Sequence, residues 1–464
     1  MFYRAIYILI IILFSVDFSV AAQEKHEAVG RPNFLVIFTD DQTYRAMGYN
    51  DPLIQTPHLD SLAAEGLVFN HAYVASPICA ASRASLYTGV FPQRHGVIAL
   101  NSKAFGAYCA GGNRSQLTLG SKLTAAGYET ALFGKSHLGD PTRFGFKQGK
   151  ECADGKALAA SHHFLQECAK TKRPFLLCLT PHKPHVPLRP DKKWLDLYET
   201  GKIPVARNFR ESPEPLSINN QGVPQQTLYR DSDYRNNYKN LPAGPPRNEE
   251  VIREFAKAYY ATISQLDDEM GHLIARLKKL HLYENTLIIY LSDNGYFLGN
   301  HGLGNKITMH EESVRVPMFV HWPAKNSRWN GVRTDALVSS LDVYPTIMAL
   351  AGLRMEKHLQ GKSLVPILDN PQMKVRDYVF SECIGVGGKP GEGHRMVRSQ
   401  KWKYVLTGAN EEYLFNERDD PFELNNAAKS PEHHEIRLKM RQLMAQWMQA
   451  NHDRKHPHFH SPRK

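Results

Sequence analysis

The stretch that decides the fold is NFLVIFTDD, residues 33–41. Its first seven residues form an apolar run, which is typical of a strand buried on both faces of a parallel sheet. The run ends at two carboxylates, Asp40 and Asp41. In open α/β sheets, ligands gather at the carboxyl ends of the strands. The stretch therefore predicts a buried strand that delivers Asp40 and Asp41 to a binding site.

Two later apolar runs end in a similar way. Residues 174–180 lead into PHKPH at 181–185, and residues 287–292 lead into SDNG at 292–295. Residues 248–280 carry apolar side chains at spacings of three and four, which predicts an amphipathic helix packed on a sheet. Further along, the pattern predicts a strand at 314–322 and a helix at 342–353. This alternation of strands and helices predicts an α/β fold.

Polar side chains after the first and third runs form a candidate metal site. Asp40, Asp41 and Asp293 offer carboxylates, and Asn294 offers an amide oxygen. Such an all-oxygen set suits Ca²⁺ or Mg²⁺ and not zinc. Taken singly, each feature has a simpler explanation, because aspartates cap helices and Asp-Asn-Gly is a common turn. Together they favour the metal site.

Three other patterns point to cofactor sites only weakly. The spacing of His182 and His185 resembles that of a pair of zinc ligands, but no HExxH helix or cysteine cluster accompanies them. Residues 134–136 match the end of a phosphate-binding loop, but the glycine required five positions earlier is Glu129. Residues 385–388 miss the dinucleotide-binding spacing and are expected to form a loop.

One cysteine stands in a longer pattern. CAASR at 79–83 is followed by LYTG at 86–89 and PQRHG at 92–96. A lone C-x-x-x-R arises by chance, and a small cysteine usually fills a core. The pattern gains weight from the segments that accompany it in order, which are 33–41, GKSHLG at 134–139, 181–185, and 292–306 with Lys306 at its end.

These five segments resemble the formylglycine-dependent sulfatases of the alkaline phosphatase superfamily. The residues around His182 are similar to those of carbohydrate sulfatases such as iduronate-2-sulfatases. The resemblance covers most of the chain from residue 33 to Lys306. It implies a large mixed, mostly parallel sheet flanked by helices, with a smaller C-terminal subdomain made of a sheet and a helix.

The resemblance also implies a sulfuric ester hydrolase with a converted cysteine. A formylglycine-generating maturase would oxidise Cys79 to an aldehyde, whose hydrate attacks sulfur and later expels sulfate. One Ca²⁺ would polarise the sulfate. The implied catalytic residues are Cys79, Arg83, Lys135, His137, His182 and Lys306. The implied metal ligands are Asp40, Asp41, Cys79, Asp293 and Asn294.

Each implied catalytic residue meets a chemical need of sulfate ester cleavage. Arg83 and Lys135 would orient and stabilise the hydrate, and His137 would remove its proton during sulfate release. Lys306 and His182 would hold the sulfate from the other side. His182 would also donate the proton to the leaving alkoxide, although it could instead only brace its loop.

Two positions depart from the family pattern. Ala81 stands where the commonest motif has proline, which leaves open which maturase acts on Cys79. Asn300 stands where many relatives carry glutamate, and we expect it to alter substrate contacts.

The charge of the chain favours anionic partners. The 57 Lys and Arg residues exceed the 46 Asp and Glu residues, giving a formal charge of +11. Part of the excess lies in residues 452–464, which we expect to form a basic, His-rich tail. No nucleic-acid-binding pattern accompanies the charge, so we expect no nucleic acid partner. The basicity is interpreted as attraction toward sulfated polymers or surfaces.

The N-terminal residues indicate export. Arg4, an apolar run at 5–16 and the small residues Ala21 and Ala22 look like a signal peptide at 1–22. Asp17 interrupts a run too short for a comfortable membrane span. The mature protein is therefore expected in the periplasm or outside the cell, without a stable membrane span.

Cysteine pairing stays open. Conversion of Cys79 would leave five of the six cysteines, so complete pairing is impossible. Cys152 could bridge to Cys168 or to Cys109. With 464 residues and 42% hydrophobic content, the chain can build one large core and a smaller one.

The domain organisation follows from changes in pattern. We expect a catalytic domain at 23–368 and a C-terminal subdomain at 369–451. The subdomain would contain short strands at 378–382, 394–399 and 402–407, then a helix at 431–451 capped by Ser430. Residues 201–247 are too long for an ordinary connection and are expected to form part of a substrate pocket wall.

The sequence leaves three functions open. The first is a secreted sulfatase acting on a sulfated carbohydrate. The second is a phosphate or phosphonate ester hydrolase of the same superfamily. The third is a non-catalytic binder of sulfated glycans, against which the complete set of catalytic residues argues. The sugar, the sulfate position and the choice between O- and N-sulfate depend on pocket walls that the sequence does not specify.

Overall fold

The computed structural model describes residues 31–100, 103–110, 114, 116–219, 247–384 and 393–453. The expected signal peptide, most of the expected tail and residues 220–246 of the expected pocket wall lie outside these residues. No helix within the described ranges is both long enough and apolar enough to cross a membrane.

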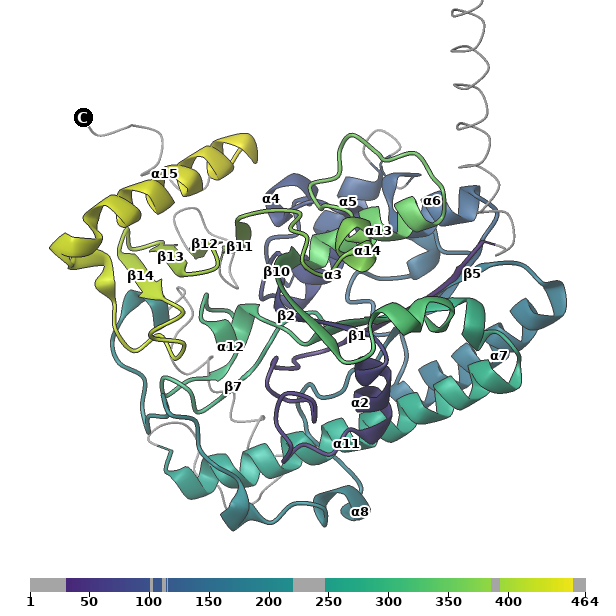
Figure 1. Ribbon diagram of the computed structural model, residues 1–464, viewed down its shortest axis with the longest axis horizontal. Helices are drawn as coiled ribbons and strands as arrows, with labels where there is room; N and C mark the ends of the chain where they lie inside the picture. Colours follow the sequence, from purple (N-terminus) through teal and green to yellow (C-terminus); the bar gives the residue numbers. More distant parts are fainter. Residues whose placement is uncertain are drawn as a thin grey trace, which may run out of the picture.

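A mixed sheet lies at the centre of the described chain (Figure 1). Its strands are β1 (Asn33–Thr39), β2 (Leu67–Tyr73), β3 (Glu129–Gly134), β4 (Gln148–Lys150), β5 (Phe175–Thr180), β6 (Thr286–Ser292), β9 (Met318–His321) and β10 (Val332–Ser339). They lie in the order β10-β2-β9-β6-β1-β5-β3-β4. All neighbouring pairs are parallel except the two that β9 makes with β2 and β6.

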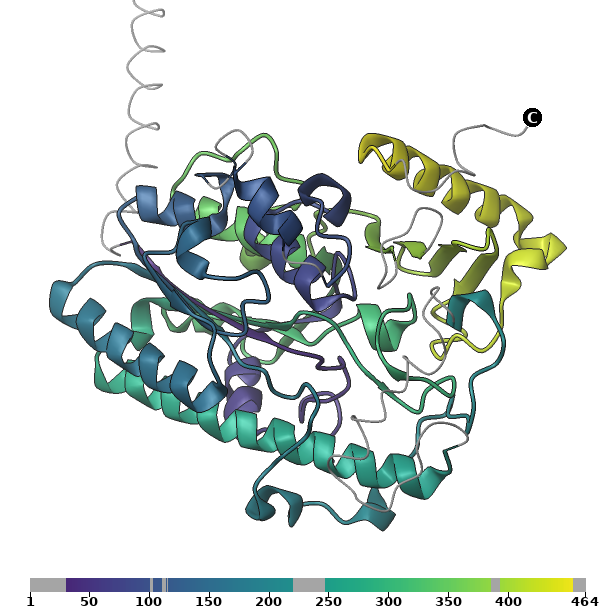
Figure 2. The ribbon, with the colours of Figure 1, turned by 180° about the vertical axis from the view of Figure 1, so that it is seen from behind.

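Helices cover both faces of this sheet (Figures 1 and 2). One face carries α2 (Pro57–Ala64), α7 (Asp154–Thr171) and α11 (Glu249–Lys279). The other carries α3 (Cys79–Thr88), α4 (Pro92–His95), α5 (Lys103–Ala110), α6 (Leu119–Ala125), α13 (Val343–Leu350) and α14 (Val365–Asp369). The short helices α8 (Lys192–Leu195) and α12 (Glu311–Val314) lie in connections.

Strand β1 supplies side chains to both layers because successive residues point to opposite faces. Phe34, Val36 and Phe38 enter the core beneath α3, and Leu35 and Ile37 enter the core beneath α11. Its seven residues are all buried, which explains why the run that predicts it is continuously apolar.

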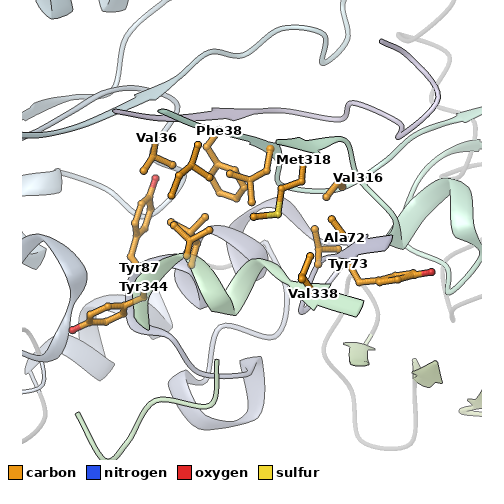
Figure 3. Close-up of a cluster of buried hydrophobic side chains, with 14 of the residues drawn as sticks. Val36, Phe38, Ala72, Tyr73, Tyr87, Val316, Met318, Val338 and Tyr344 are labelled. Atoms are coloured by element: carbon orange, nitrogen blue, oxygen red, sulfur yellow. The ribbon is translucent and has the colours of Figure 1, made fainter. Parts of the chain in front are cut away.

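The α3 side of the core fixes the position of that helix. Figure 3 shows Val36 and Phe38 of β1 packed with Tyr87 of α3, Tyr344 of α13 and Met318 of β9. Every residue of α3 is buried. Because interiors are close-packed, α3 has little freedom to move relative to the carboxyl end of β1.

A smaller antiparallel sheet forms the C-terminal part. Its strands run in chain order as β11 (Val379–Cys383), β12 (His394–Arg398), β13 (Trp402–Thr407) and β14 (Glu412–Asn416). Helix α15 (His434–Ala450) packs Met440, Met444 and Met448 against this sheet. A two-stranded ribbon, β7 (Phe297–Leu298) and β8 (Gly304–Asn305), completes the strands within the described residues.

Most predicted elements are confirmed, and two details are wrong. Helix α11 begins after Asn248, whose side chain accepts a hydrogen bond from the backbone N–H of Val251. Ser430 makes no side-chain cap, since Pro431 opens a 3₁₀ turn before α15 begins at His434. Strand β14 was not predicted.

Cys79, Cys109, Cys152, Cys168 and Cys178 form no disulfide bonds in this structure. The suggested bridges from Cys152 to Cys168 or Cys109 are therefore absent. The protein is held together by its two large cores.

Candidate active site

The carboxyl ends of β1 and β6 lie side by side and bring the acidic residues together. The strands are parallel and in register, with Thr39 opposite Ser292. Asp40 and Asp41 follow the first strand, and Asp293 follows the second. The backbone N–H of Asp41 donates to Asp293 Oδ1 at 3.2 Å. The predicted acidic set is therefore one buried cluster.

Cys79 lies beside this cluster at the first position of α3. Its Sγ lies 3.4 Å from Asp40 Oδ1 and 3.8 Å from Asp41 Oδ1. Lys306 Nζ lies 2.9 Å from Sγ. Burial raises the pKa of the Cys79 thiol far above its ordinary value, and the charges of Lys135 and Lys306 oppose this only in part. As cysteine, the side chain is a protonated thiol and a poor nucleophile.

Three cations surround the acidic cluster. Arg83 donates from Nε to Asp293 Oδ2 at 2.8 Å and from one terminal nitrogen to the Lys135 carbonyl at 2.7 Å. Lys135 Nζ pairs with Asp40, and Lys306 Nζ pairs with Asp41. Burial alone would raise the pKa of Asp40, but Lys135 and its other cationic neighbours hold it well below its usual range.

The acidic cluster fits a hard cation. Asp41 Oδ2 and Asn294 Oδ1 are buried oxygens without a hydrogen-bond partner among the described residues. Asp40, Asp41, Cys79 and His185 present ligand atoms within 4.8 Å of one another. The carboxylate and amide oxygens of Asp40, Asp41 and Asn294 are the kind of ligand that Ca²⁺ and Mg²⁺ prefer.

Asp293 differs from the other acidic residues. Its two oxygens are engaged by Arg83 and by the backbone of Asp41. Burial and the nearby charge of Asp40 raise the pKa of Asp293 to about 7. A bound cation would favour its ionised form, because an opposite charge stabilises a carboxylate.

His137 lies next to Lys135 on the loop after β3. Its backbone has a positive φ of 59°, and its Nδ1 is buried without a described hydrogen-bond partner. Burial, together with the nearby charges of Lys135 and Arg83, lowers the pKa of His137 to about 4. The ring is therefore neutral at pH 7 and able to accept a proton.

The structure brings His185 to the cluster, which the sequence analysis did not select. His185 Nδ1 donates to the carbonyl of Val186, so Nε2 is the nitrogen available for proton transfer. Nε2 lies 3.6 Å from Asp41 Oδ2. The signal was present in PHKPH, but the sequence does not say which histidine points inward.

His182 lies outside the cluster. Its side chain is 43% exposed, and its Nδ1 lies 3.2 Å from Asp154 Oδ1. It lines a hollow of about 540 Å³ with Lys183 and residues 151–155.

Asn300 is part of a buried amide network. Its Nδ2 donates to Asn208 Oδ1 at 2.8 Å and to Glu312 Oε1 at 3.2 Å. The side chain is 6% exposed. The amide N–H of Asn300 thereby satisfies a buried carboxylate, and the expectation that Asn300 alters substrate contacts stays a prediction.

Comparisons with known proteins assign the chain to a family. A family model described as Sulfatase matches residues 32–149 and 139–353. A second model, described as N-sulphoglucosamine sulphohydrolase, C-terminal, matches residues 299–450.

Curated relatives span most of the chain. An ulvan-active sulfatase of Formosa agariphila is 27% identical over 463 residues, covering 90% of this chain and 81% of that protein. An N-acetylglucosamine-6-O-sulfatase of Bacteroides thetaiotaomicron is 26% identical over 510 residues, covering 94% and 89%.

Solved structures share the fold. An enzyme in complex with its substrate D-glucosamine-2-N,6-O-disulfate has a TM-score of 0.78 at 24% identity, covering 92% of this chain and 99% of that one. A phosphonate monoester hydrolase of Agrobacterium radiobacter has a TM-score of 0.73 at 20% identity, covering 91% and 96%. Since the Sulfatase model spans well over half of the sequence, the chain belongs to the sulfatase family and is a sulfuric ester hydrolase.

Proposed function

We propose that this protein is an exported sulfatase that hydrolyses sulfate esters of a sulfated carbohydrate, using a formylglycine formed from Cys79 and one bound Ca²⁺. The observation that carries the proposal is the position of Cys79, whose Sγ touches a carboxylate cluster and a lysine at once. A buried neutral thiol has no evident use there. An aldehyde hydrate at the same position would supply the attacking oxygen.

The proposed cation would be held by Asp40, Asp41, Asp293 and Asn294, together with the modified side chain of residue 79. When bound, it would polarise the sulfate and favour ionisation of a nearby hydroxyl. The unpartnered oxygens of Asp41 and Asn294 support this assignment.

The protein side chains would stabilise charge and transfer protons. Lys306 and Lys135 supply positive charge where the sulfuryl oxygens gain negative charge. Arg83 fixes Asp293 and the backbone of Lys135. His137, neutral and with an unpartnered Nδ1, would accept the proton whose removal releases sulfate. Since Nδ1 keeps its proton on the Val186 carbonyl, His185 would give the leaving oxygen a proton from Nε2 in its imidazolium form, in which both ring nitrogens are protonated.

The direct test is the mass of the peptide that contains Cys79, measured on protein co-produced with a maturase. We expect a loss of about 18 Da, because replacing CH₂SH by CHO removes sulfur and adds oxygen while two hydrogens are lost. Cys79→Ala should fold and lose essentially all sulfate release. An unmodified peptide in fully active protein would refute the proposal.

A phosphonate ester hydrolase is the second candidate. It is favoured by the shared fold with the Agrobacterium enzyme, which covers nearly the whole chain. Turnover of matched aryl sulfate and aryl phosphonate esters separates the two. We expect the larger kcat/KM for the sulfate.

The names of the relatives and the charge of the sequence support the proposed substrate class, and the N-terminal residues support the proposed location. The ulvan-active and N-acetylglucosamine-6-O-sulfatases act on sulfated sugars by their names, and the charge of +11 suits a polyanion. We propose that residues 1–22 direct export, that 23–368 form the catalytic domain, and that 369–451 add a wall to the pocket. Assaying defined sulfated saccharides would identify the sugar.

A further inference from the structure

Asp154 makes an unusual set of contacts for the first residue of a helix. It begins α7, but its carboxylate does not cap that helix, which has Ala153 at the N-cap. Oδ1 instead accepts the backbone N–H of His182 at 2.7 Å, and Oδ2 accepts the backbone N–H of Lys183 at 3.3 Å. One carboxylate therefore fixes two consecutive peptide groups of a distant loop.

The same carboxylate also contacts the side chains of these two residues. His182 Nδ1 lies 3.2 Å from Oδ1, and Lys183 Nζ lies 3.4 Å from Oδ2. Burial favours the neutral carboxyl, but the hydrogen bonds from His182 and the charge of Lys183 hold the pKa of Asp154 below its ordinary value. Asp154 is therefore an ionised acceptor, and such charge-assisted hydrogen bonds are stronger than neutral ones.

The fixed peptide groups lead directly to His185. The backbone N–H of His185 donates to the His182 carbonyl at 2.8 Å, which closes a turn on the residue that Asp154 holds. The Lys183 carbonyl accepts the backbone N–H of Asp40 at 3.3 Å, so the turn is tied to β1 on its other side. The turn thus connects Asp154 with the loop residue whose Nε2 faces Asp41 at 3.6 Å.

We propose that Asp154 is a positioning residue, which holds the loop of residues 182–185 so that His185 Nε2 faces the nucleophile. The inference rests on the proposed function, since it assigns proton donation to His185. It also gives His182 a role: its backbone and ring are parts of the support, and its exposed imidazole is not the proton donor.

The chain offers a matched control in Glu269. Lys183 Nζ lies between Asp154 and Glu269, and the Glu269 contact is the shorter at 2.7 Å. The hydrogen bonds described for Glu269 reach this ammonium and the side chain of Gln265, and not the loop backbone. Glu269→Gln therefore removes a charge partner of the same lysine and leaves both peptide contacts in place.

The kinetic test compares two leaving groups. A displacement of a catalytic group by about 1 Å can cost about 10² in rate. We expect Asp154→Ala to lower kcat by about 10² on an alkyl sugar sulfate, whose alkoxide needs a proton, and by less than about 10-fold on an activated aryl sulfate. Asp154→Asn keeps one acceptor oxygen and should be intermediate. Glu269→Gln should stay within about twofold of the parent protein on both substrates.

A structural test needs no turnover. Hydrogen exchange at the peptide covering residues 181–186 should become faster in Asp154→Ala, and stay unchanged in Glu269→Gln. Equal losses on both substrates, or unchanged exchange, would overturn the positioning role. Absence of sulfate ester turnover in the parent protein would instead overturn the proposed function. If Asp154→Ala does not fold, Asp154→Asn provides the same comparison.

Discussion

His182 and His185 lie three residues apart on one loop but have different surroundings. The His182 ring is exposed beside Asp154, and the His185 ring faces Asp41 from inside the site. General acid catalysis is worth about 10² to 10⁴ in rate. We therefore expect His185→Ala to lower kcat/KM by about 10² or more on an alkyl sulfate, and much less on an activated aryl sulfate.

His182→Gln is the matched control for that measurement. Its amide can still donate toward Asp154, so the loop should keep its position and kcat/KM should fall less than about 10-fold. A larger leaving-group effect at His182 than at His185 would reverse the assignment.

The metal site gives a second prediction about a single residue. Asp41 has one oxygen beside Lys306 and one that makes no hydrogen bond within the described residues, so Asp41→Asn removes a charge from the cation site while keeping the size of the side chain. Ligand charge helps set Ca²⁺ affinity, and we expect calcium per chain to fall well below one after dialysis. Elemental analysis of the dialysed protein measures this. Asp335→Asn, on the exposed edge of the molecule, should retain the parent's calcium.

Single residues differ in how far the sequence could identify them. Asp40 and Asp41 were predictable, because a buried parallel strand must deliver the next residues to its carboxyl end. His185 was not, because a loop of two prolines and two histidines has no periodicity from which to infer direction. The hydrogen-bond partner that Asn300 finds in Asn208 could not be inferred, since the two residues are far apart in the chain.

At the scale of elements, α3 depends on a buried histidine. His95 Nδ1 accepts the backbone N–H of Val97 at 3.1 Å, so Nε2 carries the proton and donates to Ser85 Oγ at 3.0 Å. This bond braces the middle of the helix that carries Cys79. Burial lowers the pKa of His95 to about 3, so the ring stays neutral in the folded state.

His95 should make stability depend on pH. Its folded pKa lies below the unfolded value of about 6.5, so the unfolded chain binds the proton first as pH falls. Stability is therefore lost between about pH 6.5 and 3, by up to about 1.4 kcal/mol per pH unit from this group. In urea unfolding at several pH values, His95→Gln should be less stable than the parent at pH 7 and lose less stability on acidification. Parallel pH curves for the two proteins would contradict this.

Helices and strands could be predicted from sequence where one kind of contact determines their pattern of apolar residues. The 31 residues of α11 carry a long apolar stripe, and an amphipathic pattern of that length has few alternatives. Strand β14 has only five residues, and its place depends on pairing with β13. The start of α15 was misjudged, because Pro431 fits the first turn of either kind of helix.

At the scale of the whole molecule, buried charges join the two sheets. Lys403 of β13 lies 2.9 Å from Glu311 of α12 and 2.7 Å from Glu423. Glu417 lies 3.8 Å away. These four side chains are at most 2% exposed, so their charges are poorly screened by solvent.

Replacing Lys403 should show how much this buried network contributes to the free energy of unfolding. Lys403→Met removes one shared cation of these carboxylates, while Arg398 stays 3.7 Å from Glu311 and from Glu417. Breaking a buried pair typically costs about 3 to 5 kcal/mol. Urea unfolding followed by fluorescence would measure the loss. Lys401→Met, two residues earlier and exposed, should change stability by less than about 1 kcal/mol. Similar values for the two variants would show that the network contributes little.

The fold class followed from the alternating pattern, but the sheet order did not. The antiparallel β9 between β2 and β6 is set by which strands meet after collapse, and its apolar run is equally suited to a parallel neighbour. The second sheet was predicted by resemblance and is confirmed, whereas its attachment through Lys403 could not be inferred from separate segments.

Cys152 gives the protein a convenient place for a chemical probe. Burial raises the pKa of Cys109 to about 11 and that of Cys168 to about 12, and Cys178 is fully buried. Cys152 alone of the six is partly exposed, and it lines the hollow beside His182. A thiol reagent should therefore label about one site per native chain, which an Ellman titration would count. A dye attached there would stand beside His182 and Lys183, and so would report on changes in the loop that carries His185.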